Sequence, residues 1–138
     1  MTATSYRYLL DTNIVSEIVR NPHGAVTRRI ARVGEERVCT SIIVACELRY
    51  GAAKKASLRL GEQLEAVLAA LPIVALERDS DRHYGEIRAD LERRGKPIGP
   101  NDLLIAAQAR SLGLVLVTDN VREFGRVRDL DVKNWLPQ

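Results

Sequence analysis

Four acidic residues are the candidates for chemistry in this sequence, because each stands where a predicted strand or helix can expose it. Asp11 and Asp119 each follow a short apolar run, which is typical of a buried strand that carries a side chain to its carboxyl end. Glu47 lies in an apolar helical stretch, and Asp102 lies in the first turn of a later predicted helix. Carboxylates supply the oxygen ligands that hard cations such as Mg²⁺ or Mn²⁺ prefer. The pattern therefore indicates a divalent-cation site.

A cation held in this way supports a definite chemistry. Carboxylates that lie close together raise one another's pKa unless a cation neutralises them. Mg²⁺ can also lower the pKa of a bound water molecule and stabilise the attacking and leaving oxygens in phosphodiester cleavage. Simpler explanations stay open for single residues, because Asp11 and Asp102 also suit helix N-termini and Asp119 suits a turn. Glu47 fits such an explanation less well, since its apolar neighbours make an unpartnered carboxylate costly.

Alternating strands and helices must position these acids. Over residues 1–138, short apolar runs alternate with amphipathic stretches, which predicts an α/β fold in a single domain with a central parallel sheet. The carboxyl ends of parallel strands share one edge, where ligands bind, so the acids should meet in one crevice. Ser41 and Asn101 are the predicted N-terminal caps of the helices that carry the second and third acids. The predicted strands are 7–10, 37–40, 73–76, 114–117 and an edge strand near 132–135, and the predicted helices are 13–19, 25–33, 41–53, 58–71, 79–94 and 101–112.

Composition and the remaining reactive residues exclude several other classes of protein. Hydrophobic residues make up 46% of the chain and charged residues 28%, which is typical of a globular domain. The longest apolar stretch is too short to span a bilayer, and the expected location is the cytoplasm. His23 and His83 lie too far apart to predict a zinc site. Cys39 and Cys46 match no zinc or redox spacing, so both are expected to pack in apolar surroundings.

The basic residues predict how a nucleic acid would be held. The net charge is +3, and most of the basic residues are arginines, whose planar guanidinium suits phosphate. Aromatic residues make up only 4% of the chain, which argues against a surface on which bases stack. RNA binding is therefore expected to depend on backbone phosphates, with Arg122 and Arg126 as candidate contacts.

Four segments of the chain resemble a known family. The segments LLDTNIVSE, TSIIVACELRYGAAK, IGPNDLLIAAQA and LVTDNVREF occur in the order and spacing of PIN-domain proteins, and specifically resemble VapC-type toxins of bacterial type II toxin–antitoxin pairs. This resemblance extends across nearly the whole chain. It implies a PIN-like three-layer α/β/α sandwich with a central parallel sheet of four to five strands. It also implies a Mg²⁺-dependent endoribonuclease, a VapB-like antitoxin that occludes the site, and a homodimer that joins the antitoxin in a hetero-oligomer.

The resemblance also implies roles for single residues. Asp11, Glu47 and Asp102 match the family's metal-binding acids. The family's fourth acid commonly lies two residues after a supporting threonine, where this chain has an asparagine. Either the adjacent Asp119 takes that place, or the asparagine contributes a neutral oxygen and a second metal is held weakly. We therefore expect one tightly held metal, with a second arriving with substrate. The supporting residues are Thr12, Asn13, Thr118 and Asn120.

Three hypotheses follow from these observations. The first is cleavage of an RNA phosphodiester by metal-activated water, with Asp11 and Asp102 binding the principal ion. In this scheme Glu47 ligates the ion or orients water, and Asp119 or Asn120 completes the pocket. The second is a FitB-like PIN protein that acts mainly in a regulatory complex and contacts DNA only through its antitoxin. The third is a non-catalytic PIN module that binds a partner.

Overall fold

The computed structural model describes residues 5–137, which form an α/β fold around one parallel sheet. Residues 1–4 and 138, which the sequence assigns to the same domain, lie outside the described residues. The strands run in the order β3-β2-β1-β4-β5, and every neighbouring pair is parallel. This order places the first strand in the centre. The strands are β1 Tyr8–Leu10, β2 Val38–Ser41, β3 Ile73–Val74, β4 Val115–Val117 and β5 Val132–Lys133.

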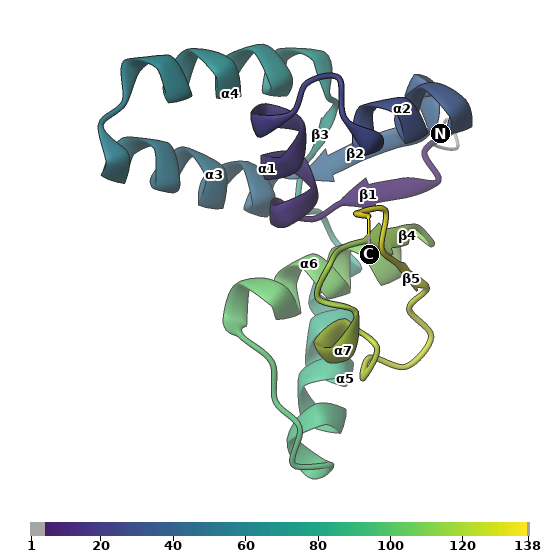
Figure 1. Cartoon of the computed structure of the whole chain (residues 1–138). Coiled ribbons are helices and arrows are strands. Elements are labelled where there is room, and N and C mark those ends of the chain that lie inside the picture. The colour runs from purple at the N-terminus through teal and green to yellow at the C-terminus, as the bar shows by residue number, and fades with distance from the viewer. Residues whose placement is uncertain (1–4, 138) are drawn as a thin grey trace.

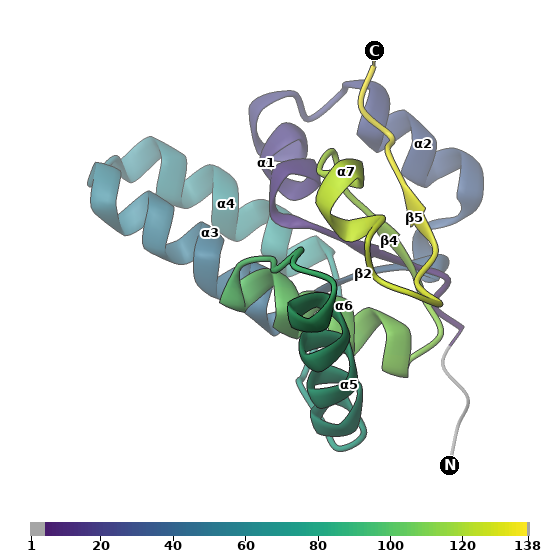
Figure 2. The ribbon, with the colours of Figure 1, turned by 90° about the horizontal axis from the view of Figure 1, so that it is seen from below.

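Helices cover both faces of the sheet. Figure 1 shows α1 and α2 above β1 and β2, with α5 and α6 below, and the view from below in Figure 2 agrees. The pair α3 and α4 packs together and extends to one side beyond the sheet in both views. The helices are α1 Thr12–Arg20, α2 Ala25–Val33, α3 Ile42–Lys55, α4 Leu58–Ala70, α5 Ser80–Arg93, α6 Pro100–Ser111 and α7 Val121–Phe124, with a short 3₁₀ helix at Glu35–Arg37.

The central strands are buried on both sides, which explains their continuous apolar sequence. Leu9, Leu10, Leu116 and Val117 are fully buried, and they belong to the main hydrophobic core. In the register of the sheet, Leu10 pairs with Thr40 on one side and with Val117 on the other. The chain segments that follow β1, β2 and β4 therefore leave the sheet at the same edge. Among the described residues, no helix is both long and apolar enough to cross a membrane.

Local signals predicted most element boundaries, with a few corrections. Ser41 caps α3 as predicted, since its hydroxyl oxygen accepts a hydrogen bond from the backbone N–H of Ile43 at 3.0 Å. Asn101 does not cap α6: the helix begins at Pro100, and Gly99 occupies the cap position. The predicted strand 73–76 is limited to two residues, because the sheet pairs only Ile73 and Val74 with β2. Cys39 is buried as expected, whereas the expectation for Cys46 was wrong, because it lies on an exposed part of α3.

Candidate active site

Asp11 lies at the centre of the candidate site, where β1 passes into α1. Its backbone N–H donates a hydrogen bond to the carbonyl of Val117 at 2.8 Å, which joins the ends of β1 and β4. Its side chain is 5% exposed, and Oδ2 accepts a hydrogen bond from the hydroxyl of Thr118 at 2.8 Å. Burial raises the pKa of Asp11, and the hydrogen bond from Thr118 partly opposes that rise. The threonine therefore stabilises the charged form of a carboxylate that burial disfavours.

The start of α1 accounts for only part of the environment of this carboxylate. Within the described residues, Asp11 occupies the N-cap position of α1 without a regular capping hydrogen bond, and the backbone N–H of Thr12 lowers the pKa of Asp11 less than the hydroxyl of Thr118 does. The side chain of Asp11 is oriented by Thr118 across the sheet. Glu47 and Asp119 also raise its pKa through charge repulsion. Asp11 consequently shares one electrostatic environment with acids from two distant segments of the chain.

Glu47 and Asp102 approach the same crevice from two further helices. Oε1 of Glu47 accepts a hydrogen bond from the hydroxyl of Thr12 at 2.6 Å, and Oε2 accepts one from Nδ2 of Asn101 at 3.5 Å. Asp102 is half-buried in the first turn of α6, and its pKa is raised to about 6. Burial is the main cause, followed by repulsion from Asp11 and Glu47. The structure therefore brings together three of the four acids that the sequence singles out, Asp11, Glu47 and Asp102.

The segment after β4 supplies the candidates for the fourth acidic position. Asp119 is exposed, and its Oδ1 accepts a hydrogen bond from Nδ2 of Asn13 at 2.6 Å. Asn120 is half-buried; its backbone N–H donates to the hydroxyl of Thr118 at 3.0 Å, and its side chain donates to Glu123 at 3.1 Å. Both candidates for the fourth position therefore border the site, each tied to a different neighbour.

Glu123 is the site residue that the sequence analysis missed. It lies on α7, and its charge raises the pKa of Asp102, an effect that Asp119 does not have. The signal was present in the segment LVTDNVREF, where Glu123 follows Asn120 by three residues and so can share its face of a helix. Recognising it required knowing that the four residues 121–124 form a helix beside the start of α6. Glu123 thus adds a third candidate for the fourth acidic position.

The two arginines predicted to bind RNA are placed differently. Arg122 is exposed on α7, next to the acidic crevice in sequence. Arg126 is half-buried, and its guanidinium donates to the backbone carbonyl of Pro97 at 3.5 Å, so it helps to hold the loop before α6. Both stay candidates for phosphate contacts.

The donor set fits a divalent cation in its chemistry. Every acid at the crevice offers only oxygen atoms. Burial and then repulsion raise the pKa of both Asp11 and Asp102, and a bound cation would offset both effects. Within residues 5–137, no group of three acidic, histidine or cysteine side chains is already arranged as a metal cage. Asp11 and Glu47 instead accept hydrogen bonds from neighbouring hydroxyl and amide groups.

Replacing Thr118 by valine should lower the free energy of unfolding by about 1 kcal/mol at pH 7, because the buried carboxylate of Asp11 loses its hydrogen-bond donor. The change keeps the shape of the side chain, so urea denaturation followed by circular dichroism reports the loss of the two hydrogen bonds of this hydroxyl, the one donated to Asp11 and the one accepted from the backbone N–H of Asn120. Thr12→Val, at the half-buried hydrogen bond to Glu47, is the matched control and should cost less. Equal stability of Thr118→Val and the original protein would contradict the role assigned to Thr118.

Comparison with known proteins decides the family. The PIN-domain profile matches residues 8–130. The chain belongs to the PIN-domain family. This PIN domain is 42% identical over 132 residues to Ribonuclease VapC2 of Haemophilus influenzae, covering 94% of this chain and 98% of that protein. It is 36% identical over 133 residues to the tRNA(fMet)-specific endonuclease VapC of Shigella flexneri, with the same two coverages.

Solved structures agree with the sequence comparison. The VapBC2 complex of Rickettsia felis, bound to a DNA fragment from its promoter, matches this PIN domain with a TM-score of 0.87 and 34% identity. The match covers 94% of this chain and 98% of the other. The predicted resemblance to VapC-type PIN domains and the predicted parallel-sheet fold are therefore confirmed.

Proposed function

We propose that this protein is a VapC-type endoribonuclease toxin that hydrolyses RNA phosphodiester bonds with the help of Mg²⁺, or of Mn²⁺ in its place. The observation that carries the proposal is the meeting of Asp11, Glu47 and Asp102, from three separate segments, in one crevice where burial and then mutual repulsion raise the pKa of Asp11 and of Asp102. The similarity to proteins named ribonuclease and tRNA endonuclease supports RNA as the substrate.

Each residue of the crevice has a separate role in the proposed site. Asp11 and Asp102 would hold the principal ion, and Glu47 would ligate it or orient the attacking water. When bound, Mg²⁺ supplies an acidified water molecule and neutralises charge on the cleaved phosphate. Thr118 fixes the carboxylate of Asp11 by its hydrogen bond, and Thr12 fixes that of Glu47. Such supporting hydrogen bonds orient the ligands and so set the affinity for the metal.

The fourth acidic position completes the proposed pocket. Asp119 and Asn120 are the candidates from the sequence, and Glu123 joins them because its charge acts on Asp102. We propose that one ion is held tightly by the first three acids, and that a second arrives with the RNA. Arg122 would then bind a phosphate beside the crevice, because it is exposed and lies on α7 with Glu123.

The partner of the proposed toxin is a VapB-like antitoxin that covers the crevice. The Rickettsia felis relative was solved as a VapBC complex on promoter DNA, which supports both an antitoxin and contact with DNA through it. We further propose a homodimer that assembles with the antitoxin into a hetero-oligomer. Because that relative was solved on promoter DNA, a FitB-like regulatory role is the second candidate function. Binding of operator DNA by the complex, without RNA cleavage by the free protein, would favour that alternative.

Removal of divalent cations tests the proposed reaction. The purified protein should cleave RNA in Mg²⁺, stop in excess EDTA, and recover when Mg²⁺ or Mn²⁺ is restored, because the repelling carboxylates need a cation between them. Gel analysis of product ends measures the cleavage, and RNA incubated with Mg²⁺ alone is the control. Cleavage that continues in EDTA would contradict a metal-dependent mechanism. Failure to cleave any cellular RNA in Mg²⁺ would contradict the ribonuclease function.

A further inference from the structure

A cavity of about 270 Å³ opens beside the carboxylate crevice, between α1, α3 and α4. Thr12 and Glu47, which hydrogen-bond to each other at the crevice, also line this cavity. Much of the remaining wall is apolar, and two of its members, Val19 and Leu64, belong to a small buried cluster. The cavity therefore runs from an apolar interior to a proposed catalytic carboxylate.

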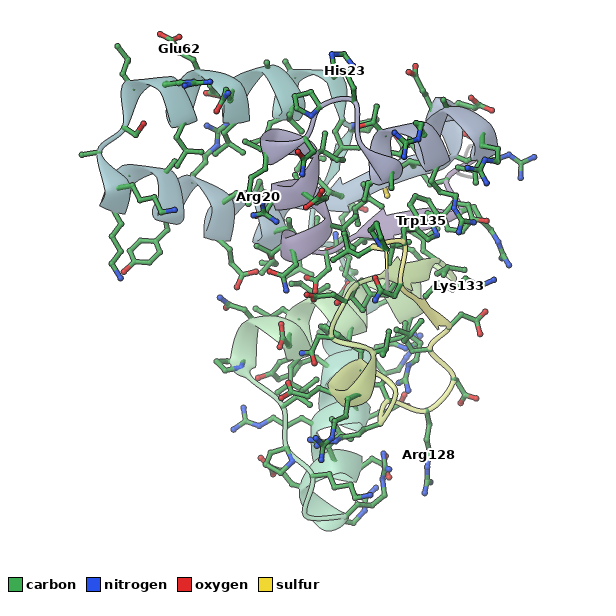
Figure 3. The ribbon with its side chains drawn as sticks, viewed as in Figure 1. Arg20, His23, Glu62, Arg128, Lys133 and Trp135 are labelled. Carbon is green, nitrogen blue, oxygen red and sulfur yellow. The ribbon has the colours of Figure 1, made fainter. Side chains whose placement is uncertain are left out.

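Polar and basic groups complete the lining. The hydroxyl of Ser16 lines the cavity and, among the described residues, has no hydrogen-bond partner. Arg20 and Lys55 add two positive charges, and Figure 3 shows Arg20 on the side of α1 that faces α3. Arg20 pairs with Glu17 at 3.2 Å, but 63% of its side chain is exposed, so this ion pair is weak and the guanidinium can turn to a phosphate.

We propose that this cavity receives a nucleobase of single-stranded RNA next to the scissile phosphate, an inference that rests on the proposed ribonuclease function. An unstacked base presents an apolar face and hydrogen-bonding edges, and the cavity offers apolar walls with the Ser16 hydroxyl. The phosphates on either side of this nucleotide are negatively charged, and the positive charges of Arg20 and Lys55 complement them. The volume of the cavity is below the range typical of pockets for drug-sized ligands, which suits one base rather than a base pair.

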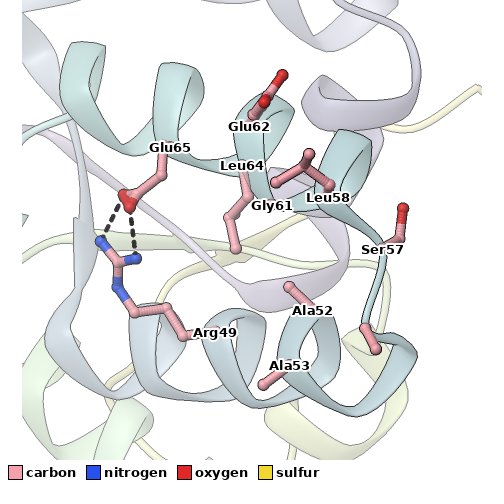
Figure 4. A pocket seen from close by; sticks show the side chains of 10 residues that line it. Arg49, Ala52, Ala53, Ser57, Leu58, Gly61, Glu62, Leu64 and Glu65 are labelled. Carbon is pink, nitrogen blue, oxygen red and sulfur yellow. Dashed lines mark hydrogen bonds and ion pairs between the residues drawn. The ribbon is translucent and has the colours of Figure 1, made fainter.

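A larger cavity elsewhere lacks this combination. It measures about 710 Å³ and lies between α3 and α4, where a two-pronged ion pair joins Arg49 and Glu65 with both N···O distances at 2.9 Å (Figure 4). None of the acids of the crevice lines it within the described residues. It shares Ala52 and Leu64 with the smaller cavity, so the two cavities adjoin at the helix pair.

Gly51 forms part of the α3 wall of the smaller cavity and adds no side chain to it. It lines the cavity from α3, and a Cβ atom added there would meet no heavy atom of the described residues within 4 Å. A larger side chain at position 51 therefore has open space around it at the wall of the cavity, where the base is proposed to lie. Glycine also weakens a helix interior relative to other residues, so filling the cavity from this position should not harm folding. Gly61 on α4 has the same free space but lines only the larger cavity.

These two glycines give a matched test. The probe is a short single-stranded RNA that carries the sequence the original protein cuts, together with two copies in which the base on one or the other side of the cut is removed to leave an abasic ribose. Gly51→Leu should lower kcat/KM on the complete RNA by about ten- to a hundredfold. On the copy that lacks the accommodated base, Gly51→Leu and the original protein should cleave at similar rates. Gly61→Leu should match the original protein on all three RNAs.

Thermal unfolding and Mn²⁺ titration calorimetry on each variant separate a filled cavity from a damaged fold or metal site. The unfolding temperature should be no lower than that of the original protein, and the Mn²⁺ affinity should be unchanged. Unaltered cleavage of the complete RNA by Gly51→Leu would overturn the inference while leaving the ribonuclease function intact. So would a loss that is equal on complete and abasic RNA. If Gly51→Leu cleaves RNA normally but no longer binds the antitoxin, the cavity receives a peptide side chain instead. Absence of cleavage by the original protein would refute the ribonuclease function itself.

Discussion

Replacing Asp11 by asparagine should reduce RNA cleavage about a thousandfold while leaving the fold intact. Asp11 is the most deeply buried of the acids, at 5% exposed. Glu47 and Asp119 raise its pKa by charge repulsion, and Asp11 in turn raises the pKa of Asp102. Asparagine keeps the shape and an oxygen that can accept the hydrogen bond from Thr118, but it removes the negative charge that a cation needs. A loss of this size matches the removal of one group that stabilises charge in a transition state.

Single-turnover cleavage of RNA in saturating Mg²⁺ measures this effect. Asp131→Asn, at an exposed acid before β5, removes the same charge from the protein away from the crevice and should cleave normally. Circular dichroism and urea denaturation should show that Asp11→Asn folds at least as stably as the original protein, because a desolvated charge has been removed. Undiminished cleavage by Asp11→Asn would reject this residue as a metal ligand.

Replacing Asp102 by asparagine should stabilise the metal-free protein at high pH and not at low pH. The pKa of Asp102 is raised from 3.8 to about 6 in the folded state. The folded protein therefore holds this proton more tightly than the unfolded chain does. The stability that the neutral acid contributes is fully present below about pH 3.8 and is lost as the pH rises through about 6. Above that range the charged, repelled carboxylate destabilises the fold, and asparagine avoids the penalty.

The expected gain is about 1–2 kcal/mol at pH 8, a value reduced from the full pKa shift because the carboxylate is only half-buried. Urea denaturation in EDTA between pH 4 and pH 8 measures the difference between Asp102→Asn and the original protein. Addition of Mg²⁺ at pH 8 should stabilise the original protein more than the variant. Asp131→Asn again serves as the control. A difference between Asp102→Asn and the original protein that stays constant over this pH range would contradict the raised pKa of Asp102.

The sequence predicts the frame of the site because the frame depends on local patterns. The apolar run before Asp11 predicts a buried strand, and the segment 25–33 predicts α2 with the boundaries that the structure has. The alternation of strands and helices then places Asp11, Glu47 and Asp102 at one edge without any knowledge of their contacts. These features follow from periodicity and chain order alone.

The contacts inside the site could not be predicted in the same way. Asn101 looks like a helix cap in the sequence, yet its amide donates to Glu47, which lies 54 residues away. Glu123 becomes part of the crevice only because α7 packs near the start of α6. Cys46 lies among apolar residues in the sequence but on the exposed side of α3. Each case depends on the packing of segments that are distant in the sequence, which no local pattern encodes.

The hydrogen bonds that join β1 to β4 have a consequence for the timing of activity. Asp11 and its orienting partner Thr118 are 107 residues apart in the sequence, and they directly follow the adjacent strands β1 and β4. The ribosome synthesises the amino-terminal part of a chain first, so Asp11 can form its hydrogen bond with Thr118 only after most of the polypeptide has been made. A ribosome-bound fragment that ends before β4 would lack an assembled crevice. An enzyme proposed to cut RNA in its own cell would thus stay harmless during its own translation, an interval in which a co-expressed inhibitor can accumulate.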